Sequence, residues 1–192
     1  MRPFHPSWTL LTAGVLLAAM PRTGEVRAEP KPAKEFALPD LNGRVRTLSE
    51  QRGKVVVLTF WATWCGPCRI ELPRLHEVYK RHKREAFEVY AINVDNAWTV
   101  ALVPAFAEQL RLSFPVLLDT DNKVAMGYDP RGVIPFTVVV DHEGRIRHMH
   151  SGYTPGDEVK LEREIVKLLQ AAEAAHTKEQ EEPGSGKKPA AG

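Results

Sequence analysis

The sequence predicts an α/β domain with a mixed central β-sheet and helices on both faces. Three observations carry this prediction: a β-branched apolar run at 55–60, a helical apolar pattern from Cys68 to Lys83, and a second apolar run from Phe87 to Asn93. A nearly continuous apolar strand is typical of a position covered on both faces. Strand, helix and strand in this order form a βαβ unit with parallel strands.

The following segment repeats the helix and strand once more. A helical pattern around Ala101–Leu112 precedes a short strand at Phe114–Leu118, and Asn122–Gly127 is expected to form a further helical turn or two. This pair adds one helix and one strand to the βαβ unit.

A hairpin and a last helix complete the predicted domain. Phe136–Val140 reads as a buried strand, Asp141–Gly144 as a turn and Arg145–Ser151 as the antiparallel partner. The helix is expected to begin after Thr154, with Pro155 in its first turn and Asp157 three residues after the cap. Four of its side chains are expected to face the core: Val159, Ile165, Leu168 and Leu169.

The ends of the chain differ from its middle. Arg2 and His5 precede an apolar run from Leu10 to Met20, and a small residue, Ala28, offers a cleavage position. Since a membrane-spanning helix needs about 20 apolar residues, we expect a cleaved signal peptide at 1–28, with an uncleaved membrane anchor as the alternative. A linker at 29–35, a single domain at 36–175 and a disordered polar tail at 176–192 follow.

Charge and composition exclude several classes of partner. The 192 residues carry 26 basic and 24 acidic side chains, a formal net charge of +2. This balance lacks the basic surface that binding to nucleic acid requires. No G-x-G-x-x-G fingerprint for a dinucleotide cofactor occurs. We therefore expect no cofactor and no nucleic-acid partner. We also expect a monomer.

The two cysteines, Cys65 and Cys68, stand two residues apart just after the first strand. A structural zinc site needs four ligands, and no second pair completes one. Covalent haem attachment requires His after the second cysteine, where Arg69 stands. A purely structural disulfide closing so short a loop yields only about 2 kcal/mol.

Redox chemistry fits the position of this pair better. A helix N-terminus offers unpaired N–H groups and a positive dipole end, which favour thiolate over thiol. In this interpretation Cys65 is the exposed nucleophile that attacks a substrate disulfide, and Cys68, one turn deeper, resolves the mixed disulfide.

Four short matches resemble the thioredoxin superfamily, in particular its extracytoplasmic TlpA/ResA-type members. They are Phe60–Cys68, the pair Glu71 and Pro73, Gly132–Pro135 and Asp141–Gly144. The resemblance extends over about residues 36–175. It implies a thioredoxin fold with the inserted helix and strand of TlpA/ResA-like proteins. Some members of that group serve cytochrome c maturation.

The resemblance also implies a substrate-binding surface around the cysteines. Pro135 corresponds to a cis proline beside the cysteines, which leaves the backbone of Ile134 free to pair with an extended substrate segment. Trp64 corresponds to a surface tryptophan of the substrate groove, to which Gly66 and Pro67 also belong. Without the resemblance, Pro135 reads as a proline that starts a strand.

The sequence departs from the family at two positions. Thr59 stands where cytoplasmic thioredoxins carry a buried aspartate that transfers protons, and a hydroxyl cannot replace this base. Glu71 is the expected substitute, with a solvated helix carboxylate as the alternative. Phe136 followed by Thr137 replaces the pairs typical of many members, which weakens an assignment to cytochrome c maturation.

The other aromatic and histidine residues carry less information. Trp61 is expected in the core, and Trp98 is expected to pack at the start of a helix. His148 and His150 alternate along a presumed strand, where an exposed strand face is favoured over a metal site.

The expected function is reduction of disulfides in exported proteins by Cys65 and Cys68. The partners are disulfide-bearing exported proteins and a membrane-bound electron donor, and the expected location is the periplasm. Two alternatives remain: an oxidase or isomerase that forms or shuffles disulfides, and a non-catalytic module that binds a metal or a partner.

Overall fold

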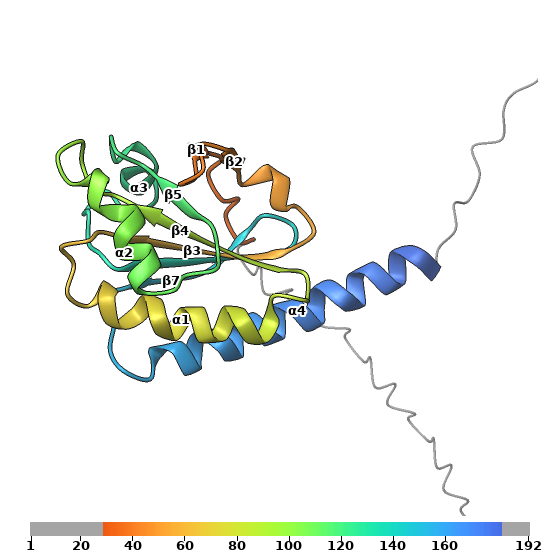
Figure 1. Cartoon of the computed structure of the whole chain (residues 1–192). Coiled ribbons are helices and arrows are strands. Elements are labelled where there is room, and N and C mark those ends of the chain that lie inside the picture. Colours follow the sequence, from red (N-terminus) through yellow and green to blue (C-terminus); the bar gives the residue numbers. More distant parts are fainter. Residues whose placement is uncertain (1–28, 182–192) are drawn as a thin grey trace, which may run out of the picture.

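The computed structural model describes residues 29–181 and contains a five-stranded mixed sheet in the order β5-β4-β3-β6-β7 (Figure 1). The strands are β3 Val55–Trp61, β4 Phe87–Asn93, β5 Val116–Leu118, β6 Phe136–Val140 and β7 Ile146–Ser151. β3 is parallel to β4 and antiparallel to β6. The mixed sheet predicted from the sequence is confirmed.

Helices cover both faces of this sheet. Figure 1 shows α1 and α4 side by side along one face, with α2 and α3 toward the other. The helical segments are α1 Cys68–His82, the 3-10 turn η2 Val100–Leu102, α2 Val103–Gln109, α3 Lys123–Tyr128 and α4 Asp157–Glu181. Bidentate hydrogen bonds from Arg81 to Glu162, both 2.7 Å, join α1 to α4.

The position of the central strand β3 determines where the cysteines lie. Every residue of β3 is buried, as its apolar run predicts for a strand covered on both faces. Its parallel neighbour β4 ends beside it, with Asn93 opposite Trp61. The loops that follow both strands therefore leave the sheet at the same edge, and the cysteines lie in the first of these loops.

A small N-terminal hairpin was not predicted. β1 (Ala37–Pro39) pairs with β2 (Val45–Thr47), followed by the 3-10 turn η1 (Ser49–Gln51). Asp40 closes the hairpin by accepting N–H groups of the turn and forms a bridge to Leu117 of β5. The hairpin thus covers an edge strand of the main sheet.

The expected boundaries need two corrections. The presumed linker 29–35 is attached to the domain: Ala33 donates to the carbonyl of Gly144 at 2.9 Å, and Ile146 donates to that of Lys31 at 2.8 Å. At the other end, α4 includes residues 176–181 of the expected tail. These residues are mostly good helix formers without Gly or Pro.

The outermost segments, 1–28 and 182–192, lie outside the described residues, and so does the expected signal peptide. Within residues 29–181, no helix is both long enough and apolar enough to cross a membrane.

Helix α4 begins later than predicted. Its first residue is Asp157, whose carboxylate accepts the N–H of Thr154 at 2.8 Å. Ile165, Leu168 and Leu169 are buried as expected, but Val159 is 45% exposed. Six residues correspond to about 600° of rotation at 3.6 residues per turn, so Val159 lies about 120° away from Ile165 around the helix.

Candidate functional site

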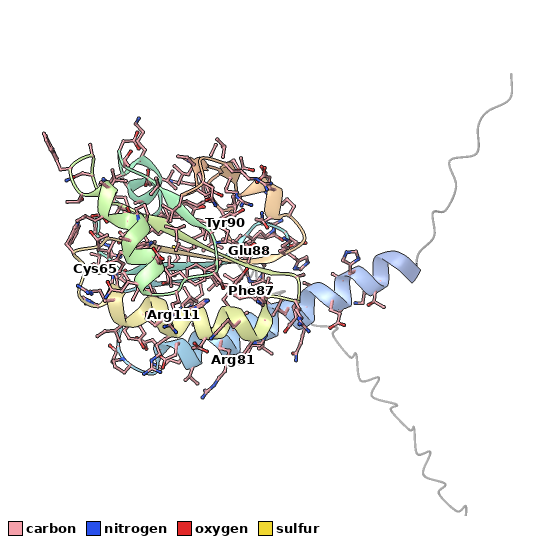
Figure 2. All side chains as sticks on the ribbon, viewed as in Figure 1. Cys65, Arg81, Phe87, Glu88, Tyr90 and Arg111 are labelled. Atoms are coloured by element: carbon pink, nitrogen blue, oxygen red, sulfur yellow. A yellow bond between two sulfur atoms is a disulfide. The ribbon has the colours of Figure 1, made fainter. Side chains whose placement is uncertain are left out.

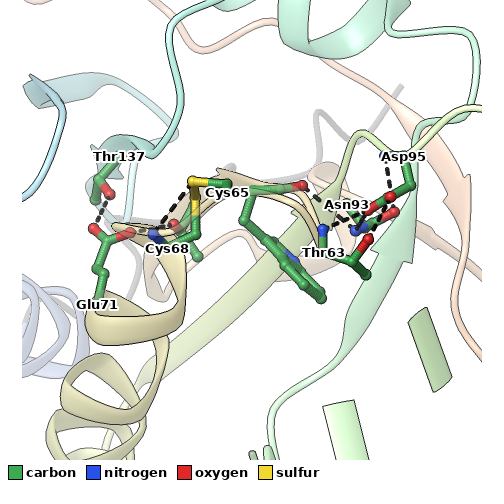
Figure 3. The surroundings of a disulfide bond; sticks show 9 residues. Thr63, Cys65, Cys68, Glu71, Asn93, Asp95 and Thr137 are labelled. Carbon is green, nitrogen blue, oxygen red and sulfur yellow. Dashed lines mark hydrogen bonds between the residues drawn. A yellow bond between two sulfur atoms is a disulfide. The ribbon is translucent and has the colours of Figure 1, made fainter. Parts of the chain in front are cut away.

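The disulfide between Cys65 and Cys68 lies where β3 leads into α1. The two Cα atoms are 5.3 Å apart, and Cys68 is the first residue of the helix. The N–H of Cys68 donates to Sγ of Cys65 at 3.2 Å (Figure 3). The N-terminus of a 15-residue helix is a position that in general favours a thiolate over a thiol.

The sulfur atoms are less accessible than the sequence suggests. Cys65, expected to be exposed, is only 4% exposed, while Cys68 is fully buried. The reason is that the Cys65 side chain turns inward to reach Cys68 and joins the apolar core. Its neighbours Trp64, Gly66 and Pro67 are exposed, so the disulfide lies just below an accessible rim. In Figure 2, Cys65 lies at the end of the domain away from the projecting end of α4.

Glu71 is buried beneath the disulfide, one turn along α1 from Cys68. Its two carboxylate oxygens accept hydrogen bonds from the hydroxyls of Thr59 at 3.2 Å and Thr137 at 2.8 Å. Burial raises the pKa of Glu71 to about 7, although the two hydroxyls oppose the shift. The alternative of a solvated helix carboxylate is therefore wrong. The raised pKa suits a group that exchanges protons near neutral pH.

The two departures noted in the sequence meet at this carboxyl group. Thr59 of β3 and Thr137 of β6 are direct cross-strand partners, and both point toward α1. In the sequence they are separate substitutions because 78 positions separate them in the chain, too far for one motif. The antiparallel register of β3 and β6 brings them together.

A small cavity connects Glu71 with the surface. It has a volume of about 150 Å³ and lies between α1, β6, β7 and the start of α4. Besides Glu71 its lining includes Thr137, His148, His150 and Asp157, with His150 Nε2 3.3 Å from the Asp157 carboxylate. A cavity of this size has room for several water molecules, and its partly polar lining brings Glu71 together with titratable side chains of β7 and α4.

The other predicted residues lie near the same edge of the sheet. The Ile134–Pro135 peptide bond is cis, as the resemblance implies. It directly precedes Phe136, which pairs with Phe60 of β3. His148 is exposed and His150 half-buried on β7, in agreement with an exposed strand face. Within residues 29–181 no group of three or more potential metal ligands occurs.

Two of the three tryptophans considered in the sequence analysis lie as expected, and the third does not. Trp61 is fully buried, as predicted, with its ring 5.4 Å from that of Phe106 in α2. Trp64 is 67% exposed beside the cysteines. Trp98, expected to pack at a helix start, is 91% exposed, because the loop before η2 turns through hydrogen bonds to Asn96 and leaves the indole outside.

Sequence reasoning missed Asp95, which joins the loops after β3 and β4. Its carboxylate accepts the backbone N–H and the hydroxyl of Thr63, both at 2.7 Å, and the amide of Asn93 at 2.8 Å (Figure 3). Burial alone raises the pKa of Asp95, but these hydrogen bonds outweigh it and hold the pKa below the usual value. The polar residues Asn93 and Asp95 at the end of an apolar run were the available signal.

The sequence profile described as "AhpC/TSA family" matches residues 30–149. The chain belongs to this family. It is 35% identical to the thiol-disulfide oxidoreductase ResA of Geobacillus thermodenitrificans over 135 residues, which is 70% of this chain and 76% of the relative. It is 37% identical to ResA of Bacillus subtilis over 125 residues, 65% of this chain and 68% of the relative.

Solved structures agree with this family and confirm the predicted thioredoxin fold. A putative thiol:disulfide interchange protein DsbE from Chlorobium tepidum superposes with a TM-score of 0.68 at 33% identity, covering 73% of this chain and 96% of that one. A putative protein disulfide isomerase from Bacteroides thetaiotaomicron gives 0.68 at 30% identity, with coverages of 77% and 93%. A putative thioredoxin from Neisseria meningitidis gives 0.64 at 27% identity, with coverages of 76% and 95%.

Proposed function

We propose that this chain is an exported thiol-disulfide oxidoreductase that reduces disulfides in extracytoplasmic proteins. The observation that carries the proposal is the Cys65–Cys68 disulfide at the N-terminus of α1, above a buried carboxyl group. Relatives at 35–37% identity are named thiol-disulfide oxidoreductases, which supports the same chemistry here.

The reaction proceeds in two exchanges. The thiolate of Cys65 attacks one sulfur of the substrate disulfide, forms a mixed disulfide and releases the other substrate sulfur as a thiolate. The Glu71 carboxylate takes the proton of the Cys68 thiol, and Cys68 then attacks Sγ of Cys65. The Cys65–Cys68 disulfide forms, the second substrate thiolate leaves, and two electrons have passed to the substrate.

The exposed rim around the disulfide is the proposed substrate-binding surface. It comprises Trp64, Gly66 and Pro67, with the backbone of Ile134 before the cis Pro135. Electrons return to the pair from outside this chain, and we propose a membrane-bound donor protein. We further propose that the enzyme acts as a monomer.

The direction of electron transfer distinguishes the proposed reductase from an oxidase or isomerase. One structural neighbour is named a putative disulfide isomerase, whereas Gly66-Pro67 between the cysteines resembles reducing thioredoxins. We expect a midpoint potential near the thioredoxin value of about −270 mV, measured by equilibration with glutathione or dithiothreitol. A value close to about −120 mV, typical of a strongly oxidising protein, contradicts the reductase assignment.

Export is proposed from the N-terminal sequence. A basic start, the apolar run Leu10–Met20 and the small residue Ala28 form the pattern of a cleaved signal peptide. We expect the mature chain to begin at or near Glu29 and to accumulate outside the cytoplasm, as N-terminal sequencing of the fractionated protein will show. A chain that begins at Met1 and sediments with membranes supports the anchored alternative instead.

A further inference from the structure

The loop between β4 and α2 carries two large apolar side chains outside the core. Trp98 is 91% exposed and Leu102 is 58% exposed. Exposed apolar side chains that cluster beside a site mark surfaces for interaction. Trp64, also exposed, comes from the segment around the cysteines and lines the same groove as Leu102.

Between these two segments lies a groove, which we call the side groove. It is shallow and open to solvent, with a volume of about 420 Å³. One wall consists of Thr63, Trp64 and Arg69, and the other includes Thr99, Leu102 and Phe106. It is therefore bounded on one side by the residue directly before Cys65.

The two walls of the side groove are held together by the buried Asp95. This carboxylate follows β4 and bonds the backbone and hydroxyl of Thr63, which lies in the opposite wall. Asn93 fixes the carboxylate from behind at 2.8 Å. The groove is thus present before any partner binds, and a preorganised surface loses less free energy to ordering on binding.

The side groove carries a positive charge. Arg69 is its charged lining residue, and the guanidinium lies over the ring of Phe106 at 5.0 Å. Within the described part of the chain, ion pairs of arginine are made by Arg46, Arg81, Arg131, Arg145 and Arg147. The guanidinium of Arg69 is thus available to a carboxylate of a partner.

We propose that the side groove binds an aromatic side chain of the substrate protein, next to a carboxylate that pairs with Arg69. The enzyme then prefers disulfides whose cysteine stands beside an aromatic and an acidic residue. Because Trp64 belongs both to the groove and to the rim of Cys65, a segment linked to Cys65 can reach it. The inference rests on the proposed function and names the substrate class of that site.

Three synthetic disulfide-linked peptides test this preference. Their cysteine is flanked by Phe-Glu, by Phe-Lys or by Gly-Gly, and kcat/KM for reduction is measured with the full mature chain. We expect the Phe-Glu peptide to be reduced about tenfold faster than the Gly-Gly peptide, a difference of about 1.4 kcal/mol. The Phe-Lys peptide should lie below the Phe-Glu peptide.

Two substitutions connect the preference with the groove. Leu102→Asp should remove the preference for Phe-Glu while leaving reduction of 2-hydroxyethyl disulfide, a small disulfide without an aromatic ring or a carboxylate, unchanged. Arg69→Glu should reverse the order of the Phe-Glu and Phe-Lys peptides, and this ratio cancels any effect on the thiols. Val45→Ser, which changes a 55% exposed side chain on β2, is the matched control and should keep the wild-type preference.

The outcomes separate the inference from the proposed function. Equal rates for the three peptides, or a preference that survives Leu102→Asp, overturn the inference. Equal rates together with a dimer that Leu102→Asp dissolves assign the groove to a second copy of this chain and overturn it as well. A wild-type protein that reduces neither peptides nor the small disulfide contradicts the proposed function itself.

Discussion

Replacing Cys65 with serine is expected to lower the rate of insulin disulfide reduction by at least about 1,000-fold. The hydroxyl of serine is not ionised near neutral pH, so the first exchange loses its nucleophile. Cys68→Ser should also stop turnover, but for a different reason: Cys65 still attacks and nothing resolves the mixed disulfide. Turbidity of precipitating insulin chains, followed with excess dithiothreitol as donor, measures both variants.

The two variants control one another, because each removes the same disulfide and one sulfur atom. Preferential alkylation should occur at Cys65 in the reduced wild type, since its sulfur faces the helix N-terminus while Cys68 is fully buried. Insulin reduction that persists in Cys65→Ser rules out the assigned nucleophile. A wild type that fails to reduce insulin at all supports a non-catalytic binding module.

Glu71→Gln is expected to change how stability depends on pH in the oxidised protein. The pKa of Glu71 is raised from 4.5 to about 7, so between these values the folded state keeps a proton that the unfolded state has lost. The wild type therefore loses stability as pH rises from about 4.5 to 7, by about 3 kcal/mol in total, and the variant lacks this loss. Urea unfolding at several pH values measures the difference.

Comparison of the two proteins cancels the contributions of all other titratable groups. Glu77→Gln on the same helix is the control: Glu77 lies on the surface and pairs with Lys80 at 2.8 Å, so its removal should not reproduce the change. In the reduced protein, Glu71→Gln should also lower the pH at which Cys65 ionises. Parallel stability curves for wild type and Glu71→Gln from pH 4.5 to 7.5 show that the carboxyl has an ordinary pKa.

The main strands could be predicted because buried strands consist of continuous runs of apolar residues, which are visible in the sequence. β4 and β6 have the bounds expected from their apolar runs, and β3 exceeds its run by one residue, Trp61. β1 and β2 escaped detection because each has three residues, too few for a pattern. The end of α4 was missed because polarity indicates exposure and does not exclude a helix.

The site was predictable where one motif holds its parts together. Cys65 and Cys68 belong to a single short segment, and Glu71 follows in the same helix. The partners of Glu71 were not predictable, because Thr59 and Thr137 become neighbours only through the register of β3 and β6. Asp95 likewise acquires its role from a loop 32 positions earlier in the chain.

Trapping with Cys68→Ser tests the central claim most directly, namely that Cys65 exchanges disulfides with proteins and Cys68 resolves the product. The reduced variant is incubated with a disulfide-bearing protein and analysed intact by mass spectrometry without reductant. We expect a covalent adduct that dithiothreitol releases and whose linked peptide contains Cys65. An adduct in equal amount on Cys65→Ser, or no adduct on Cys68→Ser, contradicts the account.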